Sequence, residues 1–306
     1  DIERIEVIKG SAASTLYGTE AAAGVIQIFT KQGASGAPRW TIQVDQGFNK
    51  LMPFAPDVDV RPESDITPDS PRGSYSYKYL NMDPYLRNGH RQRYALSVSG
   101  GTPQVRYFIS GHLDANEGVL PLDQEDKVGV RGNFTFNPLP QMTVQFNSSY
   151  NRTDITSTPA GNNAQGLILN AFRRERNYFS DGTPDTVRQV LNQELTTRID
   201  RFVVGATVNY DLNDNFTNRV TVGFDQAVQD NRNLRPYGFR QEPFGILYTG
   251  VHNFETLTLD YVGNYRLQLT NRLRTTLSVG GQSVTTNQRA VRAEAGVEHR
   301  VEDPAV

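Results

Sequence analysis

Residues 133–150 read NFTFNPLPQMTVQFNSSY, and the pattern of this stretch recurs through most of the chain. Before and after the turn at 138–141, apolar residues fill every second position: Phe134, Phe136, Met142, Val144 and Phe146. Alternation with a period of two residues gives a strand with one apolar and one polar face. Two such runs around a proline-rich turn predict an antiparallel pair of strands.

Nine runs of this kind follow one another from Trp40 onward. Their first apolar residues are Trp40, Tyr94, Val105, Val128, Met142, Phe202, Phe216, Leu257 and Leu273. The connections between the runs differ in length: short turns are expected at 100–103, 138–141, 213–215 and 270–272, and long connections at 51–91, 119–126, 155–198 and 235–253. The chain thus turns tightly at one end of the strands and loosely at the other.

This combination predicts the fold class. Short turns at one end and long loops at the other are typical of membrane barrels. The runs are about 10 residues long, as a membrane crossing requires, whereas strands of soluble proteins average about 5 to 6. We therefore predict an all-β protein, a partial transmembrane antiparallel β-barrel with about nine strands of a larger barrel. A large soluble β-sandwich or solenoid is the alternative, because its strands also alternate between an apolar and a polar face.

The composition excludes several other classes. The 306 residues include 31 basic and 33 acidic side chains, interspersed, with a net charge of −2, so no nucleic-acid partner is expected. No window holds 18 consecutive apolar residues, so no membrane helix is predicted. The absence of cysteine excludes disulfides and cysteine-ligated metals. A start at Asp1, in the middle of a strand pattern and without a signal peptide, leads us to expect a fragment.

The first 31 residues form a different pattern. Residues 2–10 (IERIEVIKG), 16–18 (LYG) and 23–31 (AGVIQIFTK) place two strand-like runs around a small-residue turn of helix. This order of segments resembles the end of the plug domain of TonB-dependent outer-membrane receptors, with matches at Arg4, Glu6, Gly10, Leu16, Tyr17, Gly18 and Gly24. The resemblance implies that residues 1–33 are the α+β C-terminal part of a plug. Residues 34–306 would then be the N-terminal part of the barrel, with long extracellular loops.

A second segment points to a branch of this family. Residues 107–111 (YFISG) and 116–121 (NEGVLP) resemble early barrel strands of the SusC/RagA branch, which imports glycans and peptides. The resemblance implies TonB-dependent, energy-coupled import of a nutrient, with an oligosaccharide or a peptide as the expected substrate. Two alternatives stay open: a siderophore or cobalamin receptor of the same superfamily, and a soluble extracellular β-sheet binding module.

The resemblance also implies a location and partners. The protein would lie in the outer membrane of a Gram-negative bacterium, in contact with its lipid. It would bind the TonB complex through a missing N-terminal segment and pair with a surface lipoprotein of the SusD type. Because the family's barrel has about 22 strands, the chain is expected to stop well short of closure.

The resemblance and the loop composition suggest candidate contacts. Plug arginines of the family pair with barrel carboxylates, so Arg4 is a candidate for such an ion pair; local pairing among Glu3, Arg4, Glu6 and Lys9 is the alternative. Aromatic residues of the long connections are candidates for ligand contact, namely Tyr75, Tyr77, Tyr237, Phe239 and Tyr248. Packing of these rings within their own loops is the alternative. Helical segments are expected at 165–176 and 185–195.

No enzymatic site is predicted. Ser110 and His112 share one face of a strand, but two side chains at this spacing on a barrel wall do not make a catalytic triad. The other histidines, His90, His252 and His299, are scattered and indicate no metal cluster. We therefore expect no cofactor, with Ca²⁺ bound by the long extracellular loops left open as an alternative.

Overall fold

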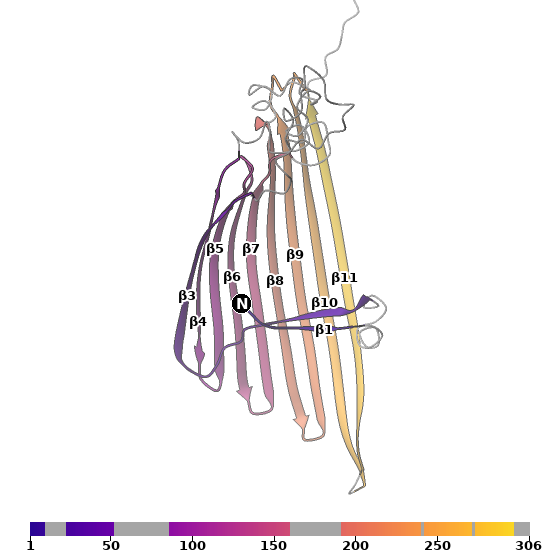
Figure 1. The fold of residues 1–306 in the computed structure, drawn as a ribbon. Helices are drawn as coiled ribbons and strands as arrows, with labels where there is room; N and C mark the ends of the chain where they lie inside the picture. The colour runs from indigo at the N-terminus through magenta and orange to yellow at the C-terminus, as the bar shows by residue number, and fades with distance from the viewer. Residues whose placement is uncertain (10–22, 52–85, 160–190, 240–241, 271–272, 297–306) are drawn as a thin grey trace, which may run out of the picture.

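The computed structural model describes residues 1–9, 23–51, 86–159, 191–239, 242–270 and 273–296. These residues form two antiparallel sheets, one of two strands and one of nine (Figure 1). The small sheet pairs β1 (Ile2–Ile8) with β2 (Val25–Thr30). The predicted boundary after residue 33 falls in the connection between the two sheets, at residues 31–35.

The large sheet is an up-and-down wall in which each strand pairs with its neighbours in sequence. Its strands are β3 (Gly36–Asn49), β4 (Gly89–Gly101), β5 (Val105–Glu117), β6 (Gln124–Leu139), β7 (Met142–Thr156), β8 (Glu194–Asn213), β9 (Phe216–Arg235), β10 (Ile246–Thr270) and β11 (Leu273–Gly296). The predicted all-β fold, a partial barrel of nine antiparallel strands, is confirmed. The described part of the chain contains no helix of the length and apolarity needed to cross a membrane.

Two connections expected to be long are short, which corrects the sequence analysis. The connection expected at 119–126 occupies residues 118–123, where Gly118 N–H donates to Asp123 O (2.7 Å) and Arg87 donates to the carbonyls of Gly118 and Asp123. The connection expected at 235–253 spans only residues 236–245. The strands on either side of each connection continue beyond their apolar runs, because backbone hydrogen bonds between strands persist where both faces carry polar side chains. For the same reason Leu195, expected in a helix, lies in β8.

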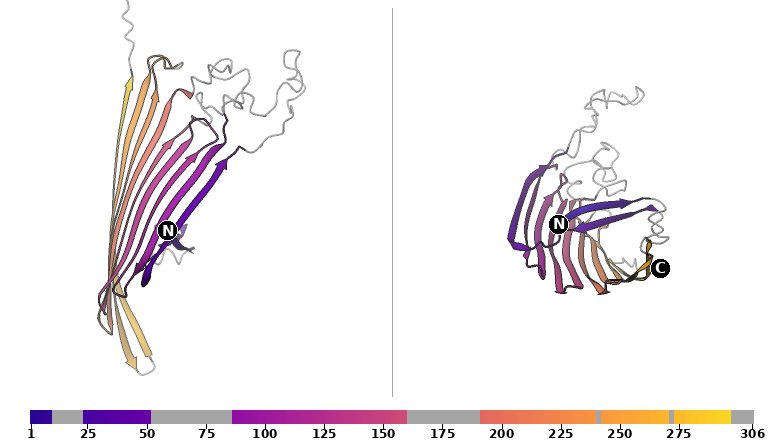
Figure 2. Two further views of the ribbon diagram at one scale, coloured as in Figure 1. Left: turned by 90° about the vertical axis from the view of Figure 1, so that its left-hand side faces the viewer. Right: turned by 90° about the horizontal axis from the view of Figure 1, so that it is seen from below.

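The small sheet identifies the inner face of the wall. Seen from below, the nine strands form an arc, and the β1–β2 hairpin crosses its concave side (Figure 2). Ser110 of β5 and Asn133 of β6 hydrogen bond to residues next to this hairpin or in it, and both belong to the polar set of their strands. The polar face therefore points inward and the apolar face outward.

The apolar band on the outer face ends along a diagonal. Towards the long connections, the first charged or amide residue beyond the band is Gln46 on β3, Gln92 on β4, Asp126 on β6, Arg152 on β7, Asp200 on β8, Gln226 on β9 and Glu255 on β10. When paired residues are followed across the sheet from β3 to β10, this limit moves by two outward-facing positions towards the short turns. Strands that tilt by about 35–45° from a barrel axis produce such a shift when the band lies perpendicular to that axis.

Candidate functional site

The hairpin is attached to the inner face of the wall through Asn133. The Nδ2 group of Asn133 donates to Thr30 Oγ1 (3.1 Å) and to the backbone carbonyl of Lys31 (2.7 Å). Asn133 is 0% exposed. Asparagine fits this position because its short polar side chain can stand on the inner face of a strand and reach a backbone carbonyl. Asn133 therefore holds the point at which the chain leaves β2.

A second attachment lies one strand away, at Asp1. Ser110 Oγ donates to Asp1 Oδ2 (2.9 Å), and Arg131 Nε lies 3.7 Å from the same oxygen. The N–H of Lys31 in turn donates to the carbonyl of Asp1 (2.8 Å), so both ends of the hairpin meet here. Ser110 therefore binds the residue that precedes the hairpin, a role that its position beside His112 on the strand did not predict.

Close backbone contact completes the attachment at Gly33. A Cβ atom at this position would lie 2.3 Å from the backbone nitrogen of Tyr107, which is too close for any side chain. Glycine thus lets the chain cross directly over β5 on its way to β3. Asn133, Ser110, Arg131 and Gly33 together form what we call the plug contact. Alternation with Val130, Phe134 and Phe136 places Arg131 and Asn133 on the polar face of their strand, but it does not show which polar residues meet the hairpin.

The predicted plug residues that the structure describes lie within the hairpin. Arg4 Nε is 2.7 Å from Glu6 Oε1, and its guanidinium lies 3.7 Å from the centre of the Phe29 ring. This is the local alternative considered for Arg4. Gly24 has φ +108°, a conformation that favours glycine. Gly10, Leu16, Tyr17 and Gly18 lie outside the described residues, as does the expected turn of helix.

A pocket of about 670 Å³ lies on the inner face at the end of the strands that carries the long connections. Its inner-face lining comes from four neighbouring strands and includes Thr197, Asn231, Asn233, Tyr248, His252 and Arg292. Thr197 Oγ1 donates to Asn231 Oδ1 (3.0 Å), whereas the buried Oδ1 of Asn233 has no hydrogen-bond partner among the described residues. This mouth pocket therefore offers amide, hydroxyl, guanidinium and aromatic groups to a polar ligand.

The candidate ligand residues differ in their surroundings. Tyr248 lines the mouth pocket, and Tyr237 is 82% exposed in the connection before β10. Phe239 is 2% exposed, and the Arg235 guanidinium lies 6.0 Å from the centre of its ring, which fits the alternative of packing within the loop. Tyr75 and Tyr77 lie outside the described residues, as do the expected helix at 165–176 and all but the last residues of that at 185–195. Ligand contact by Tyr237 and Tyr248 stays a prediction.

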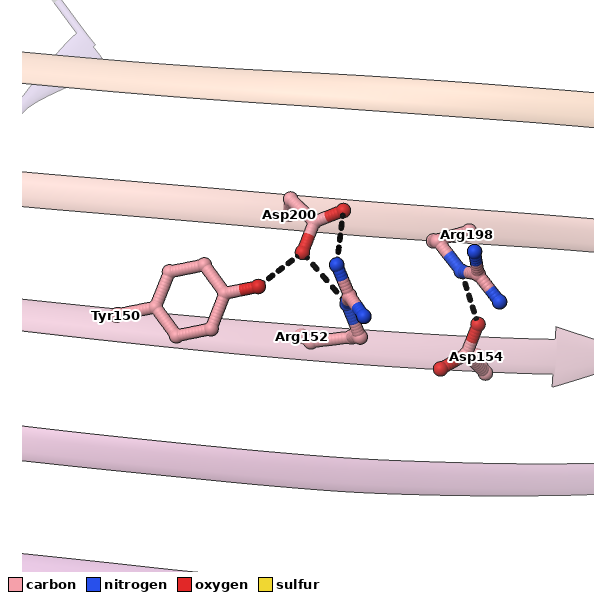
Figure 3. A network of polar contacts seen from close by, with 5 residues as sticks. All are labelled: Tyr150, Arg152, Asp154, Arg198 and Asp200. Carbon is pink, nitrogen blue, oxygen red and sulfur yellow. Dashed lines mark hydrogen bonds and ion pairs between the residues drawn. The ribbon is translucent and has the colours of Figure 1, made fainter.

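A charged network occupies the outer face beyond the apolar band (Figure 3). Arg152 donates to both carboxylate oxygens of Asp200, at 2.7 and 3.3 Å, and Tyr150 OH donates to the same carboxylate. In the next register row, Arg198 Nε lies 2.6 Å from Asp154 Oδ1. The hydrogen bond from Arg152 is the main cause that lowers the pKa of Asp200 below its ordinary value of 3.8. This network keeps four charges paired beside the apolar band.

Two curated proteins are similar in sequence to the chain. TonB-dependent receptor P3 of Formosa agariphila is 27% identical over 198 residues, which cover 60% of this chain and 19% of that protein. TonB-dependent receptor P39 of the same organism is 22% identical over 263 residues, covering 77% of this chain and 25% of that protein. The chain thus spans a quarter or less of these relatives. No protein-family model matches it.

Solved structures share the arrangement of hairpin and wall. The RagAB peptide transporter aligns with a TM-score of 0.77 at 13% identity, covering 97% of this chain and 40% of that one. A wall of up-and-down strands with a hairpin on its inner face is therefore a fold that the chain shares with part of the RagAB peptide transporter, and its sequence is similar to two TonB-dependent receptors.

Proposed function

We propose that the protein containing this chain imports a nutrient across the outer membrane of a Gram-negative bacterium, with energy supplied through TonB. The observation that carries this proposal is the plug contact. Among the described residues, polar contacts at Asn133, Ser110 and Arg131 join a small sheet to a much larger one. Such a hairpin can be held at rest and moved by force without breaking the wall.

The proposed substrate is an oligosaccharide or a peptide that binds first at the mouth pocket. The pocket carries hydrogen-bonding amides and one tyrosine ring, which suit sugar hydroxyls as well as peptide groups. The likeness to a peptide transporter supports a ligand of this size. A surface lipoprotein of the SusD type and the TonB complex are the proposed partners.

The proposal is tested with the full-length receptor in its own host. Peptide and oligosaccharide mixtures, each carrying a heavy isotope, are offered to wild-type cells, to cells lacking the receptor and to cells lacking TonB. We expect wild-type cells, and neither of the two mutant strains, to deplete defined components of one of the mixtures. Equal depletion by all three strains, or recovery of the receptor in a fraction released without detergent, contradicts the proposal.

The mouth pocket is tested by Tyr248→Ala, with Tyr265→Ala on the same strand as the matched control outside that pocket. The tyrosine in the pocket should support binding of the depleted component, whereas Tyr265 lies near the short turn, beside Phe216, and does not line the pocket. Isothermal titration of the purified receptor should show a loss of about 1 kcal/mol or more, roughly fivefold in affinity, for Tyr248→Ala only. Equal affinities for both variants would remove the pocket from the proposal.

A further inference from the structure

A groove of about 740 Å³ runs over the apolar outer face of β3 to β6. Its lining is almost wholly apolar and is centred on Gly111 of β5, which leaves a gap between larger neighbours. Leu96 of β4 and Val130 of β6 stand beside Gly111 in the same register row. Ile42 extends this row on β3 and is 74% exposed. The outer surface is thus hollowed where most of the band is filled by side chains.

Packing does not require glycine at position 111. A Cβ atom there would meet its nearest neighbours, Gly129 O and Val130 Cγ1, at 3.6 and 3.9 Å, which are ordinary contact distances. The backbone of Gly111 is a regular part of β5 and is not among the glycines with positive φ. A larger residue is therefore compatible with the strand, and the absence of one is what forms the groove.

A polar rim borders the groove on the side of the long connections. A second pocket, of about 360 Å³, shares Tyr94, Leu113 and Val128 with the groove and adds Asp126 and Asp154. These two carboxylates face each other in register on the outer side of β6 and β7. Arg198 pairs with Asp154, as Figure 3 shows, whereas Asp126 accepts a hydrogen bond only from the neutral Gln124 among the described residues. The rim of the groove therefore has excess negative charge.

We propose that this groove binds one acyl chain of a membrane lipid and that the rim at Asp126 holds its headgroup. An acyl chain fits because the groove lies within the apolar band, runs along its surface and opens at the level where charged side chains begin. The negative rim favours a headgroup that brings a cation, either its own amine or a divalent ion bound to its phosphate. The inference rests on the proposed membrane location.

The groove should hold this lipid in preference to the surrounding bilayer lipid through packing and charge rather than through hydrophobicity. An acyl chain in the bilayer is already surrounded by apolar groups, so moving it into the groove gains no hydrophobic free energy. What the groove adds is contact on several sides with Leu96, Leu113 and Val130, and the charge of the rim. Filling the groove should therefore remove the bound lipid even though the surface remains apolar.

The test uses the full-length receptor, extracted from outer membranes in mild detergent and examined by native mass spectrometry. Wild type should retain one lipid through detergent exchange, and its mass distinguishes a phospholipid from lipid A. Gly111→Leu should lower the retained fraction at least threefold. Ala206→Leu adds a side chain on the outer face of β8, outside the groove, and should retain the lipid as wild type does. Asp126→Asn should lower retention without filling the groove.

Heat-dependent migration in gels reports whether each variant folds. Val130→Phe fills the same space from the neighbouring strand and serves as a second variant if Gly111→Leu does not fold. Retention that is equal in wild type, Gly111→Leu and Val130→Phe overturns the proposal. So does a groove filled by a second copy, seen as a dimer that either variant dissociates. A receptor released without detergent would instead show that the membrane location itself is wrong.

Discussion

The most direct test of the plug contact is Asn133→Ala. The substitution removes two hydrogen bonds from a side chain that is 0% exposed. Each is worth about 0.5–1.5 kcal/mol net, and water can enter the small space left, so the attachment should weaken by about 2 kcal/mol. That free energy corresponds to roughly a 30-fold rise in the population with a detached hairpin.

Hydrogen exchange of the full-length receptor measures this population. Amides of β1 and β2 that exchange only after detachment should exchange roughly 30-fold faster in Asn133→Ala, while amides of β6 keep their wild-type rates. Asn147→Ala is the matched control, because Asn147 pairs with Asn133 in register and lies on the same face, over Gly205. A change below threefold, or an equal change in the control, would refute the assignment of Asn133 as a hairpin anchor.

Three further predictions follow from single contacts. Ser110→Ala removes one hydrogen bond to Asp1 and should accelerate exchange of β1 about fivefold, which the same experiment measures. Gly33→Ala places a Cβ atom against the Tyr107 backbone and should lower the yield of folded receptor, as read by heat-dependent gel migration, whereas Gly47→Ala, with open space around it, should not. Because the folded-state pKa of Asp200 is lowered, its charge stabilises the folded protein above the ordinary pKa of 3.8, and this contribution disappears as the pH falls through the folded-state value. Asp200→Asn should therefore flatten the loss of thermal stability below about pH 4, as measured by circular dichroism in acid; an unchanged acid profile would contradict the role of the Arg152 pair.

The sequence predicts the wall well because the wall depends on local alternation. The stretch around Met142 assigns each side chain to a face, and the structure places Asn133 and Ser110 inward as that rule requires. Strand ends were less predictable, since β9 and β10 continue through residues such as Asp230 and Thr249 that are polar on the outer face. There the apolar pattern stops although backbone pairing does not.

The contacts between distant parts of the chain could not be predicted from alternation. Asn133 meets Lys31, 102 residues away, through the path that the chain takes over β5, and nothing local to either residue encodes that path. The same holds for Ser110 and Asp1, 109 residues apart. Arg4 was the residue that resemblance suggested as a plug-to-barrel contact, yet a nearer partner two residues along the strand, Glu6, satisfies its charge.

The strength of the plug contact can be compared with that of the wall it joins. Asn133 contributes two hydrogen bonds and Ser110 one, and the Arg131 pair is longer than a hydrogen bond, at 3.7 Å, so these contacts of the described residues contribute about 2–5 kcal/mol. β6 alone pairs along most of its length with both β5 and β7, and such ladders must open together. A pulling force on the hairpin would therefore break its contact with Asn133 long before it separated two strands of the wall. Gly33, pressed against the Tyr107 backbone, is where such a movement would stop, because beyond it the chain enters β3 and joins the ladder.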